Sequence, residues 1–449
     1  MKISVIGLGK LGAPLAAVFA AKGHEVIGVD LNSNFVDKIN GGIAPVDEPQ
    51  LQDMIDQGRE RLRATTSFEA AVLASDITCV IVPTPSNEQG IFTNSYVLSA
   101  MEALGPGLRA KAGYHVVVIT STVMPGSCDG EIRAALEQSS GRRIGINLGL
   151  CYSPEFIALG SVVHNLLNPD MVLIGESDRR AGDHLSELLL SSAANKPPVQ
   201  RMNLVNAELT KISVNTYVTT KISYANMLSD ICDRLPGADV DVVTTALGLD
   251  TRIGRKYLRG ATGYGGPCFP RDNVAFSVMA RAVGASPLLA EATDAINNYQ
   301  PDRLADMVRR HCAPGAVIAV LGLSYKPDTG VIEESHGIKL VLKLTEGGMR
   351  AVCHDPKAGP GAQAVLGDRA VVVDDAAAAV RQADLVVVMT PWPEYATVAV
   401  ENFQRADAPL VVIDPWRIMS EDVMDAATII YPGRFRAGTE PAVQIAANA

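Results

Sequence analysis

The sequence predicts an α/β protein with two Rossmann-like, doubly wound domains joined by a long central helix. Three observations lead to this fold class: a strand, a glycine-rich turn and a helix at the start, a second series of apolar strands in the last third, and a long helical pattern between them. A chain of 449 residues has room for two or three domains. We expect an N-terminal Rossmann domain at 1–200, a central helical region at 201–300 and a C-terminal Rossmann-like domain at 301–449.

The first thirty residues carry a dinucleotide-binding pattern. An apolar strand leads into Gly7, Gly9 and Gly12 at G-x-G-x-x-G spacing, and an Ala-rich helix and a second strand ending at Asp30 follow. Such glycines let backbone N–H groups approach a pyrophosphate at the positive end of the helix. A carboxylate about 20 residues later suits a ribose 2′-hydroxyl and repels a 2′-phosphate, so Asp30 predicts NAD rather than NADP.

Further apolar runs predict the rest of two parallel sheets. In the N-terminal part the runs are 76–85, 114–123 and 146–156, and in the C-terminal part they are 316–327, 350–356, 383–395 and 409–417. Each N-terminal run ends in Pro, Ser, Thr or an acid, at the sheet edge where ligands bind. The second sheet has only Gly322 where a phosphate loop needs more glycines, so we expect for it a different ligand edge or a structural role.

The central helix is predicted at about 203–233. It places Lys211 and Asn215 four residues apart, on one helix face, and continues that face into Asn226 and Ser229. From this segment alone, a solvated or interface stripe is as good an interpretation as a reactive one.

Composition excludes several classes of protein. The net charge of −10 argues against generic nucleic-acid binding. No apolar run approaches the roughly 18 residues that a membrane span needs, and the opening "MKISVIGLGKLG" is typical of a strand and not of a signal peptide, so we expect a cytoplasmic protein without a membrane partner. The seven cysteines are scattered without metal-ligand spacing, so neither disulfides nor a metal site are expected.

One cysteine stands in an unusual loop, "TGYGGPCFPRD" at 262–272. Glycines and prolines surround Cys268, and Arg271 and Asp272 follow it. The glycines allow close approach to a ligand, and the prolines limit the entropy lost on fixing the thiol. Cys268 is either a reactive thiol in a rigid loop or a small apolar residue in a turn.

Taken together, these motifs resemble the UDP-glucose/GDP-mannose dehydrogenase family over residues 1 to about 435. The resemblance is carried by "SPEF" (153–156), "NPD" (168–170), the Lys211/Asn215 pair, "RIGRKYLRGATGYGGPCFPRD" (252–272), "GLSYKP" (322–327) and Arg417 in "DPWR". It implies an NAD-dependent, four-electron oxidation of the 6-hydroxymethyl group of a nucleotide sugar through a cysteine thiohemiacetal and thioester. The "CFPRD" segment resembles the branch that converts UDP-glucose to UDP-glucuronate.

The resemblance also implies residue roles. Cys268 is then the nucleophile, whose thiolate needs a cation nearby, and Lys211 and Asn215 stabilise oxyanions, a kind of interaction that contributes about 3 kcal/mol per donor. Asp272 assists proton handling, Thr122 positions water and Glu155 is the base for thioester hydrolysis. The implied cofactor contacts are Gly7, Gly9, Lys10, Leu11, Gly12, Asp30, Pro83, Thr84, Pro85, Ser121 and Thr122. The implied substrate contacts are Glu155, Lys211, Asn215, Arg252, Arg259, Tyr264, Gly265, Tyr325, Lys326 and Arg417. Arg252 resembles an arginine that reaches a neighbouring subunit, which implies a homodimer through the central helix.

Four positions depart from the family pattern. Phe35 stands in place of a basic residue, Leu159 in place of an acid, Glu333 in place of a cofactor-binding arginine, and Pro267 in place of a small hydroxyl residue. Exchanging an arginine near a pyrophosphate for a glutamate turns attraction into repulsion, so we expect weaker NAD binding or a compensating basic residue elsewhere.

Three alternatives remain. In the first, the substrate is GDP-mannose, whose enzymes have a related cysteine loop, or a UDP-N-acetylhexosamine, whose enzymes commonly have His before the cysteine. The chain is a β-hydroxyacid dehydrogenase of the 6-phosphogluconate type, which needs neither the cysteine loop nor a second nucleotide fold. Or it is a catalytically idle nucleotide-sugar sensor, as Leu159 and Glu333 suggest.

Overall fold

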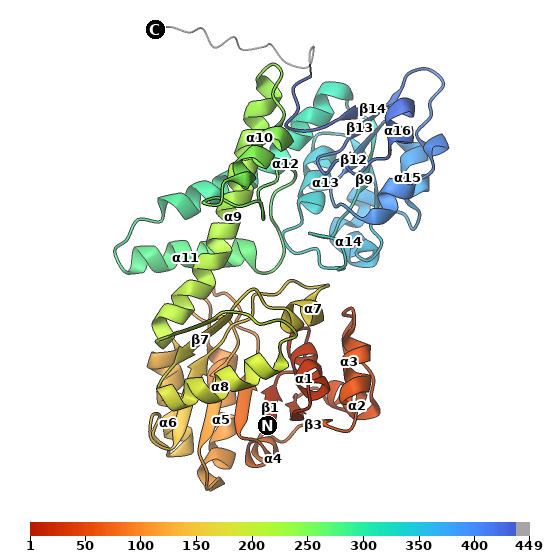
Figure 1. The fold of residues 1–449 in the computed structure, drawn as a ribbon. Coiled ribbons are helices and arrows are strands. Elements are labelled where there is room, and N and C mark those ends of the chain that lie inside the picture. Colours follow the sequence, from red (N-terminus) through yellow and green to blue (C-terminus); the bar gives the residue numbers. More distant parts are fainter. Residues whose placement is uncertain (437–449) are drawn as a thin grey trace. The chain divides into compact units, whose positions relative to one another are not determined.

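The computed structural model describes residues 1–436 and confirms the predicted fold class, since one α/β sheet precedes and a second follows a central helical region along the chain (Figure 1). The chain forms two compact units, Met1–Ser213 and Val214–Ala449, and the border between them falls inside the long helix α9 (Leu204–Arg234). Figure 1 colours the N-terminal unit red to yellow-green and the C-terminal unit green to blue.

The N-terminal unit is built on an eight-stranded sheet in the order β3-β2-β1-β4-β5-β6-β7-β8, with β7 antiparallel to β6 and every other pair parallel. Its strands are β1 (Lys2–Ile6), β2 (Glu25–Val29), β3 (Leu62–Thr65), β4 (Ile77–Val80), β5 (His115–Ile119), β6 (Leu148–Tyr152), β7 (Val172–Glu176) and β8 (Val199–Met202). Its helices before α9 are α1 (Gly12–Ala21), α2 (Ser33–Gly41), α3 (Leu51–Gly58), α4 (Phe68–Ala74), α5 (Ser95–Ala110), α6 (Arg133–Ser140), α7 (Val162–Leu167) and α8 (Arg179–Ser192), with a π-helical turn at Cys128–Ile132.

The C-terminal unit contains a six-stranded parallel sheet in the order β11-β10-β9-β12-β13-β14. Its strands are β9 (Val317–Leu321), β10 (Arg350–His354), β11 (Ala370–Val372), β12 (Leu385–Val388), β13 (Leu410–Ile413) and β14 (Ala427–Ile430). Its helices are α10 (Val240–Leu249), α11 (Phe269–Ala282), α12 (Leu288–His311), α13 (His336–Glu346), α14 (Gly359–Leu366), α15 (Ala376–Gln382) and α16 (Glu421–Ala426), with short 3₁₀ turns at Gly367–Arg369, Pro393–Thr397 and Val400–Asn402.

Each sheet is buried on both faces, which explains its near-continuous apolar strands. In β9, Ile318 and Val320 belong to one apolar core, whereas Ala319 and Leu321 belong to another on the opposite face. Alternate side chains of a strand point to opposite faces, so one short apolar run supplies both cores.

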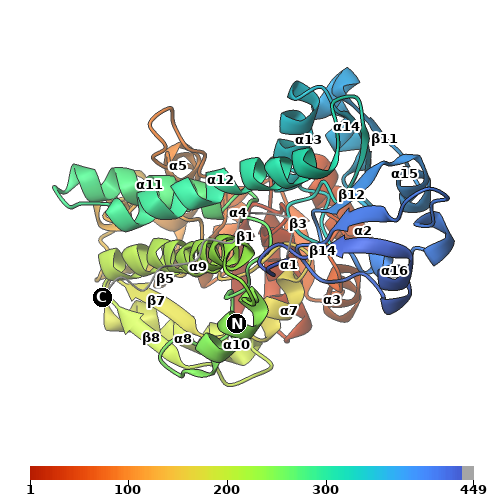
Figure 2. The same ribbon diagram turned by 90° about the horizontal axis from the view of Figure 1, so that it is seen from above.

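Three long helices of the C-terminal unit pack together beside its sheet. The Ser223 hydroxyl on α9 donates to the Thr293 carbonyl on α12 at 2.8 Å, and α11 lies alongside α12 (Figure 2). Among residues 1–436, no helix is both long and apolar enough to cross a membrane.

Candidate active site

The glycine turn of the N-terminal unit is tight at two of its three glycines. Gly7 has a φ of +95°, and a Cβ there would lie 2.4 Å from the Ile81 carbonyl oxygen. A Cβ on Gly12 would lie 1.8 Å from the Gly7 carbonyl oxygen, so α1 packs directly on the turn. At Gly9 a Cβ would meet nothing within 4 Å, which leaves room in front of the helix. Within residues 1–436, no side chain caps the start of α1, so the first N–H groups of this helix can donate to an anion. Lys10, just before the helix, is exposed.

Asp30 lies at the end of β2 beside this turn. Its carboxylate accepts from the Leu8 amide N–H at 2.7 Å and from the Asn32 amide N–H at 2.8 Å. A cavity of about 350 Å³ adjoins it, lined by Ile6, Gly7, Val29, Asp30, Leu31, Phe68, Val82, Pro83, Tyr96, Ser99, Ala100 and Ala103. The lining is apolar apart from the backbone, two hydroxyls and one carboxylate, and it includes no basic side chain. It therefore suits a nucleoside better than a 2′-phosphate.

The loops after β4 and β5 are tied together at the same sheet edge. The Ser121 hydroxyl accepts from the Val82 amide N–H at 2.9 Å and donates to the Val82 carbonyl at 2.7 Å. The Thr84 hydroxyl donates to the Thr122 carbonyl at 2.7 Å, and exposed Pro83 and Pro85 flank Thr84. These bonds fix the segments that the sequence assigned to cofactor contacts.

Glu155 follows β6 and lies close to the start of α9. The Lys211 ammonium group donates to the Glu155 carbonyl at 2.7 Å, and its nitrogen lies 4.8 Å from the centroid of the Phe156 ring. Desolvation raises the pKa of the Glu155 carboxyl group to about 7, an effect that the Lys211 charge partly opposes. A carboxyl group of this kind can exchange a proton near neutral pH.

In the C-terminal unit, Cys268 occupies the N-cap position of α11 without a side-chain capping hydrogen bond, and its side chain is exposed. The other six cysteines are buried or half-buried, and desolvation raises the pKa of Cys79 and Cys353 to about 12. The positive end of the α11 dipole favours a negatively charged sulfur at position 268. The geometry thus fits an accessible, reactive thiol and not a packing residue.

Asp272 lies one turn into α11 and pairs with α9. Its carboxylate accepts from the Asn215 side-chain amide at 2.6 Å, and only 1% of its surface is exposed. The Arg271 guanidinium approaches the same carboxylate at 3.7 Å. Asn215 follows Lys211 by one turn on α9, as the sequence pattern predicted.

The turn after β9 packs against the cysteine loop. A Cβ on Gly266 would lie 2.6 Å from the Tyr325 ring, and one on Gly265 would lie 2.5 Å from the Glu334 carbonyl oxygen. The Tyr264 side chain is buried, and its hydroxyl donates to the Asp294 carboxylate. Tyr325 and Lys326 are half-buried on the turn itself.

Two arginines gather near the carboxyl end of β13. The Arg259 guanidinium donates to the Trp416 carbonyl and lies 5.6 Å from the Trp416 ring centroid. Arg417 has a φ of +55°, and its Nε bonds the Asp241 carboxylate at 2.7 Å. Both Nη atoms of Arg417 are buried and lack a hydrogen-bond partner within residues 1–436, and one of them lies 3.5 Å from the Asp239 carboxylate.

Arg252 lies on the loop after α10. Its side chain is 86% exposed and bonds the Asp250 carboxylate at 2.6 Å. It is therefore accessible to a second chain.

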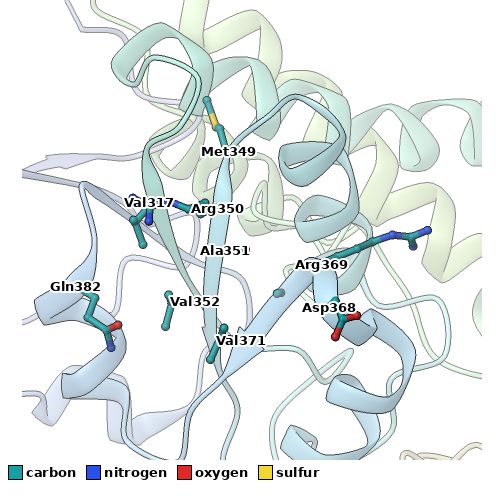
Figure 3. A pocket seen from close by; sticks show the side chains of 10 residues that line it. Val317, Met349, Arg350, Ala351, Val352, Asp368, Arg369, Val371 and Gln382 are labelled. Atoms are coloured by element: carbon teal, nitrogen blue, oxygen red, sulfur yellow. The ribbon is translucent and has the colours of Figure 1, made fainter.

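A cavity of about 610 Å³ lies at the opposite edge of the C-terminal sheet (Figure 3). It is lined by Val317, Met349, Arg350, Ala351, Val352, Asp368, Arg369, Ala370, Val371 and Gln382. Val317, Arg350 and Ala370 begin their strands, whereas ligands of open parallel sheets bind beyond the strand carboxyl ends. We therefore assign no ligand to it. No cluster of His, Cys, Asp or Glu in residues 1–436 is arranged to hold a metal ion.

Comparison with known proteins agrees with this arrangement along the chain. Three parts of the UDP-glucose/GDP-mannose dehydrogenase family match: the NAD binding domain at residues 1–191, the central domain at 205–299 and the UDP binding domain at 319–421. The chain belongs to the UDP-glucose/GDP-mannose dehydrogenase family.

Individual relatives extend over nearly the whole chain. UDP-glucose 6-dehydrogenase of Haloferax volcanii is 37% identical over 94% of this chain and 97% of its own length. A UDP-glucose dehydrogenase structure from Pyrobaculum islandicum has a TM-score of 0.86 at 33% identity, covering 96% of this chain and 97% of that one. The UDP-D-ManNAc dehydrogenase structure from Pyrococcus horikoshii has a TM-score of 0.81 at 25% identity, covering 97% and 99%.

NAD is the cofactor of this family, and the N-terminal unit fits it. The open space at Gly9, the uncapped α1 and the carboxylate of Asp30 beside an apolar cavity are the features that a dinucleotide requires.

The four departures from the family pattern take different places in the structure. Phe35 packs against the apolar core of the N-terminal unit, and Leu159 is half-buried in the loop before α7. The Glu333 carbonyl accepts from the Gly266 amide N–H at 2.9 Å while its side chain is exposed, and Pro267 is half-buried beside Cys268. Glu333 is thus tied to the cysteine loop through its backbone.

Sequence reasoning missed Glu208, a buried carboxylate three residues before Lys211. It accepts from the Gly126 amide N–H at 2.6 Å and the Cys128 amide N–H at 2.8 Å, and thereby ties the loop after Thr122 to α9. Glu208 could have been found only as an acidic residue on the buried side of α9, and residue spacing alone does not reveal which side of the helix is buried.

Proposed function

We propose that the chain oxidises the 6-hydroxymethyl group of UDP-glucose to the carboxylate of UDP-glucuronate. The observation that carries this proposal is Cys268, an exposed thiol at the start of α11 within one turn of the Asn215–Asp272 pair. The names of the relatives above favour UDP-glucose as the substrate.

The proposed roles follow the chemistry of an alcohol that loses four electrons. NAD, when bound, takes up the two hydrides, one on each of two molecules. The Cys268 thiolate adds to the aldehyde carbon, and the resulting thiohemiacetal is oxidised to a thioester. Lys211 and Asn215 donate hydrogen bonds to the oxyanions.

Release of the product breaks the carbon–sulfur bond. Thr122 positions a water molecule, the Glu155 carboxylate takes its proton as the oxygen attacks the thioester carbon, and the Cys268 thiolate leaves. Asp272 assists the proton transfers that take place beside the Cys268 sulfur.

The substrate diphosphate is assigned to Arg259, Lys326 and Arg417, because a guanidinium group binds two phosphate oxygens through parallel N–H donors and a lysine ammonium group binds them as a point charge. Tyr264, Gly265 and Tyr325 line the sugar end.

The alternative functions are oxidation of GDP-mannose, oxidation of a UDP-N-acetylhexosamine, and a sensor without turnover. Incubation with NAD and each nucleotide sugar, followed by absorbance of the reduced cofactor, separates them: we expect UDP-glucose to be oxidised fastest, with two NAD reduced per sugar. No reduction with any sugar would support the sensor.

The pH dependence of the rate tests the assignment of Glu155. With a pKa of about 7, its basic form is lost as the pH falls, so kcat drops about tenfold per pH unit below 7. We expect Glu155→Gln to lower kcat and to remove this acid limb. A limb that persists in Glu155→Gln would assign the base to another group.

We also propose a homodimer through α9. Tyr217, Tyr224 and Ile231 recur every seven residues on this helix and are 62%, 46% and 48% exposed, an apolar stripe of the kind that pairs two helices. A partner there would bring an arginine such as Arg252 to a neighbouring subunit. Tyr224→Lys should produce a monomer in sedimentation, whereas a dimer that persists would place the contact elsewhere. We likewise propose that the protein is cytoplasmic and that its domain borders lie near residues 200 and 300.

A further inference from the structure

Two buried asparagines hold the backbone of the loop that precedes Cys268. Asn226 on α9 accepts from the Ala261 amide N–H at 2.9 Å and donates to the Thr262 carbonyl at 3.1 Å. Asn297 on α12 accepts from the Tyr264 amide N–H at 2.8 Å and donates to the Tyr264 carbonyl at 3.0 Å. We propose that Asn226 and Asn297 are positioning residues that set the place of Cys268 during the reaction.

The chemistry of each contact suits the side-chain amide of asparagine. A primary amide offers one acceptor and donors on the same planar group, so one side chain satisfies a backbone N–H and a backbone C=O together, as a neighbouring strand would. Asn226 is 0% exposed and Asn297 is 3% exposed, so water does not replace either bond.

The loop is held on both sides at Gly263, between the two clamped segments. A Cβ there would lie 2.3 Å from the Asn297 amide oxygen and 2.1 Å from the His336 ring. The His336 Nε2 atom lies 3.2 Å from the Tyr264 carbonyl oxygen, on the side of α13. The backbone therefore has one place to lie, between α9, α12 and α13.

Short connections carry this placement to the thiol. Tyr264 precedes Cys268 by four residues, and its ring packs edge-on against Phe269, the residue after Cys268, at 6.4 Å between centroids. A shift of the clamped segment therefore moves the first turn of α11. A displacement of about 1 Å at a reacting atom costs about a hundredfold in rate.

The proposal rests on Cys268 as the nucleophile, and its test uses Asn226→Ala and Asn297→Ala in the full-length protein. Ser223→Ala is the matched control, because Ser223 links the same helices, α9 and α12, through the Thr293 carbonyl at 2.8 Å without touching the loop. We expect kcat to fall about 10- to 100-fold in each asparagine variant, with KM for UDP-glucose within about twofold, and the control to keep the wild-type kcat.

A second measurement does not depend on turnover. Cys268 is the exposed cysteine, so its alkylation by iodoacetamide at pH 7, followed on the peptide that contains it, reports the environment of the thiol. In both asparagine variants this rate should fall about fivefold, because the sulfur is no longer held at the positive end of α11. The control should alkylate like the wild type.

The outcomes separate the two ideas. If the wild-type protein does not oxidise UDP-glucose, the proposed function fails. If Cys268→Ala oxidises UDP-glucose at the wild-type rate, Cys268 is not the nucleophile and the positioning role is wrong with it. If Cys268→Ala is inactive while both asparagine variants keep wild-type kcat and alkylation, the positioning role is wrong and the function stands. If the alanine variants unfold, Asn226→Asp and Asn297→Asp, which keep the acceptor, carry the same test. Unfolding of these as well, beside a folded Ser223→Ala, would make the asparagines supports of the whole unit and overturn the proposal.

Discussion

The turn after β1 and the turn after β9 begin in the same way and end with different tasks. The Gly7 amide N–H donates to the Val29 carbonyl at 2.7 Å, and the Gly322 amide N–H donates to the His354 carbonyl at 2.8 Å. Both glycines have positive φ, +95° and +107°. In each turn the carboxylate that ends the neighbouring strand, Asp30 or Asp355, accepts from the next amide N–H.

The two turns diverge at their third residue, Gly9 or Ser324. The space at Gly9 is open, and Asp30 lies beside the apolar cavity. Ser324 instead donates its amide N–H and its hydroxyl to Asp355, both at 2.8 Å, and the Trp392 indole N–H approaches the same oxygen at 3.2 Å. Asp355 is consequently 6% exposed and has no capacity left for a ribose.

The turns also differ in length. In each turn, a glycine of the following helix packs against the carbonyl oxygen of the first glycine. In the first unit this is Gly12, five residues after Gly7, and in the second it is Gly337, fifteen residues after Gly322. The longer turn carries Tyr325 and Glu333 to the cysteine loop. One fold thus leaves a cradle for a dinucleotide in the first unit and holds the cysteine loop in the second.

Removing the carboxylate of the closed turn should have the largest effect. Asp355→Ala removes the acceptor of the Leu323, Ser324 and Ala358 amide N–H groups in a buried place, and we expect it to destabilise the protein by about 3 kcal/mol or more. Denaturant unfolding measures this loss. Asp375→Ala removes an exposed helix cap of the same unit and should cost only about 1 kcal/mol. Equal losses in the two variants would mean that Asp355 is an ordinary cap.

Filling the open turn should affect binding and spare the fold. Gly9→Val places a side chain where no protein atom lies within 4 Å, so stability should change little, while NAD affinity falls about 100-fold, or about 3 kcal/mol. Calorimetric titration with NAD measures this change. Gly113→Val, at an equally open glycine before β5, should bind NAD normally. Normal NAD binding by Gly9→Val would remove the pyrophosphate from this turn.

The smallest effect is expected at the carboxylate of the open turn. Asp30→Ser removes the charge that repels a 2′-phosphate, so the ratio of kcat/KM for NAD over NADP should fall about tenfold, or about 1.4 kcal/mol. Steady-state rates with both cofactors give the ratio. An unchanged ratio would show that Asp30 acts only as a support for the Leu8 amide.

Strong local patterns predicted most of the fold. The helix expected at 203–233 is α9, Leu204–Arg234, and each apolar run named in the sequence contains an observed strand. No run was named in the sequence for β3, β7, β8, β11 and β14. Strands β3, β8, β11 and β14 are short and partly exposed, so they give no long apolar run, whereas β7, "VLIGE", is a buried apolar run that went unnoticed. Gly337 was hidden by the ten extra residues of the second turn.

The candidate site was less accessible to sequence reasoning. The spacing of Lys211 and Asn215 places both on one face of α9, but nothing in it reveals that Asn215 bonds Asp272, 57 residues later. The pairing of Asn226 and Asn297 with one loop joins segments distant in sequence for the same reason. Burial of the Glu155 carboxyl group, which raises its pKa, likewise depends on packing that local composition does not encode.

The most direct test of the account is the detection of substrate carbon bound to Cys268. Glu155→Gln should form the thioester and hydrolyse it slowly, so acid quenching after incubation with NAD and UDP-glucose should give an increased mass on the peptide that contains Cys268. Cys268→Ser should bind the nucleotide sugar but make uronic acid far more slowly than the wild type, because a serine alkoxide forms far less readily than a thiolate. An unmodified Cys268 peptide, together with wild-type production of uronic acid by Cys268→Ser, would contradict covalent catalysis by this thiol.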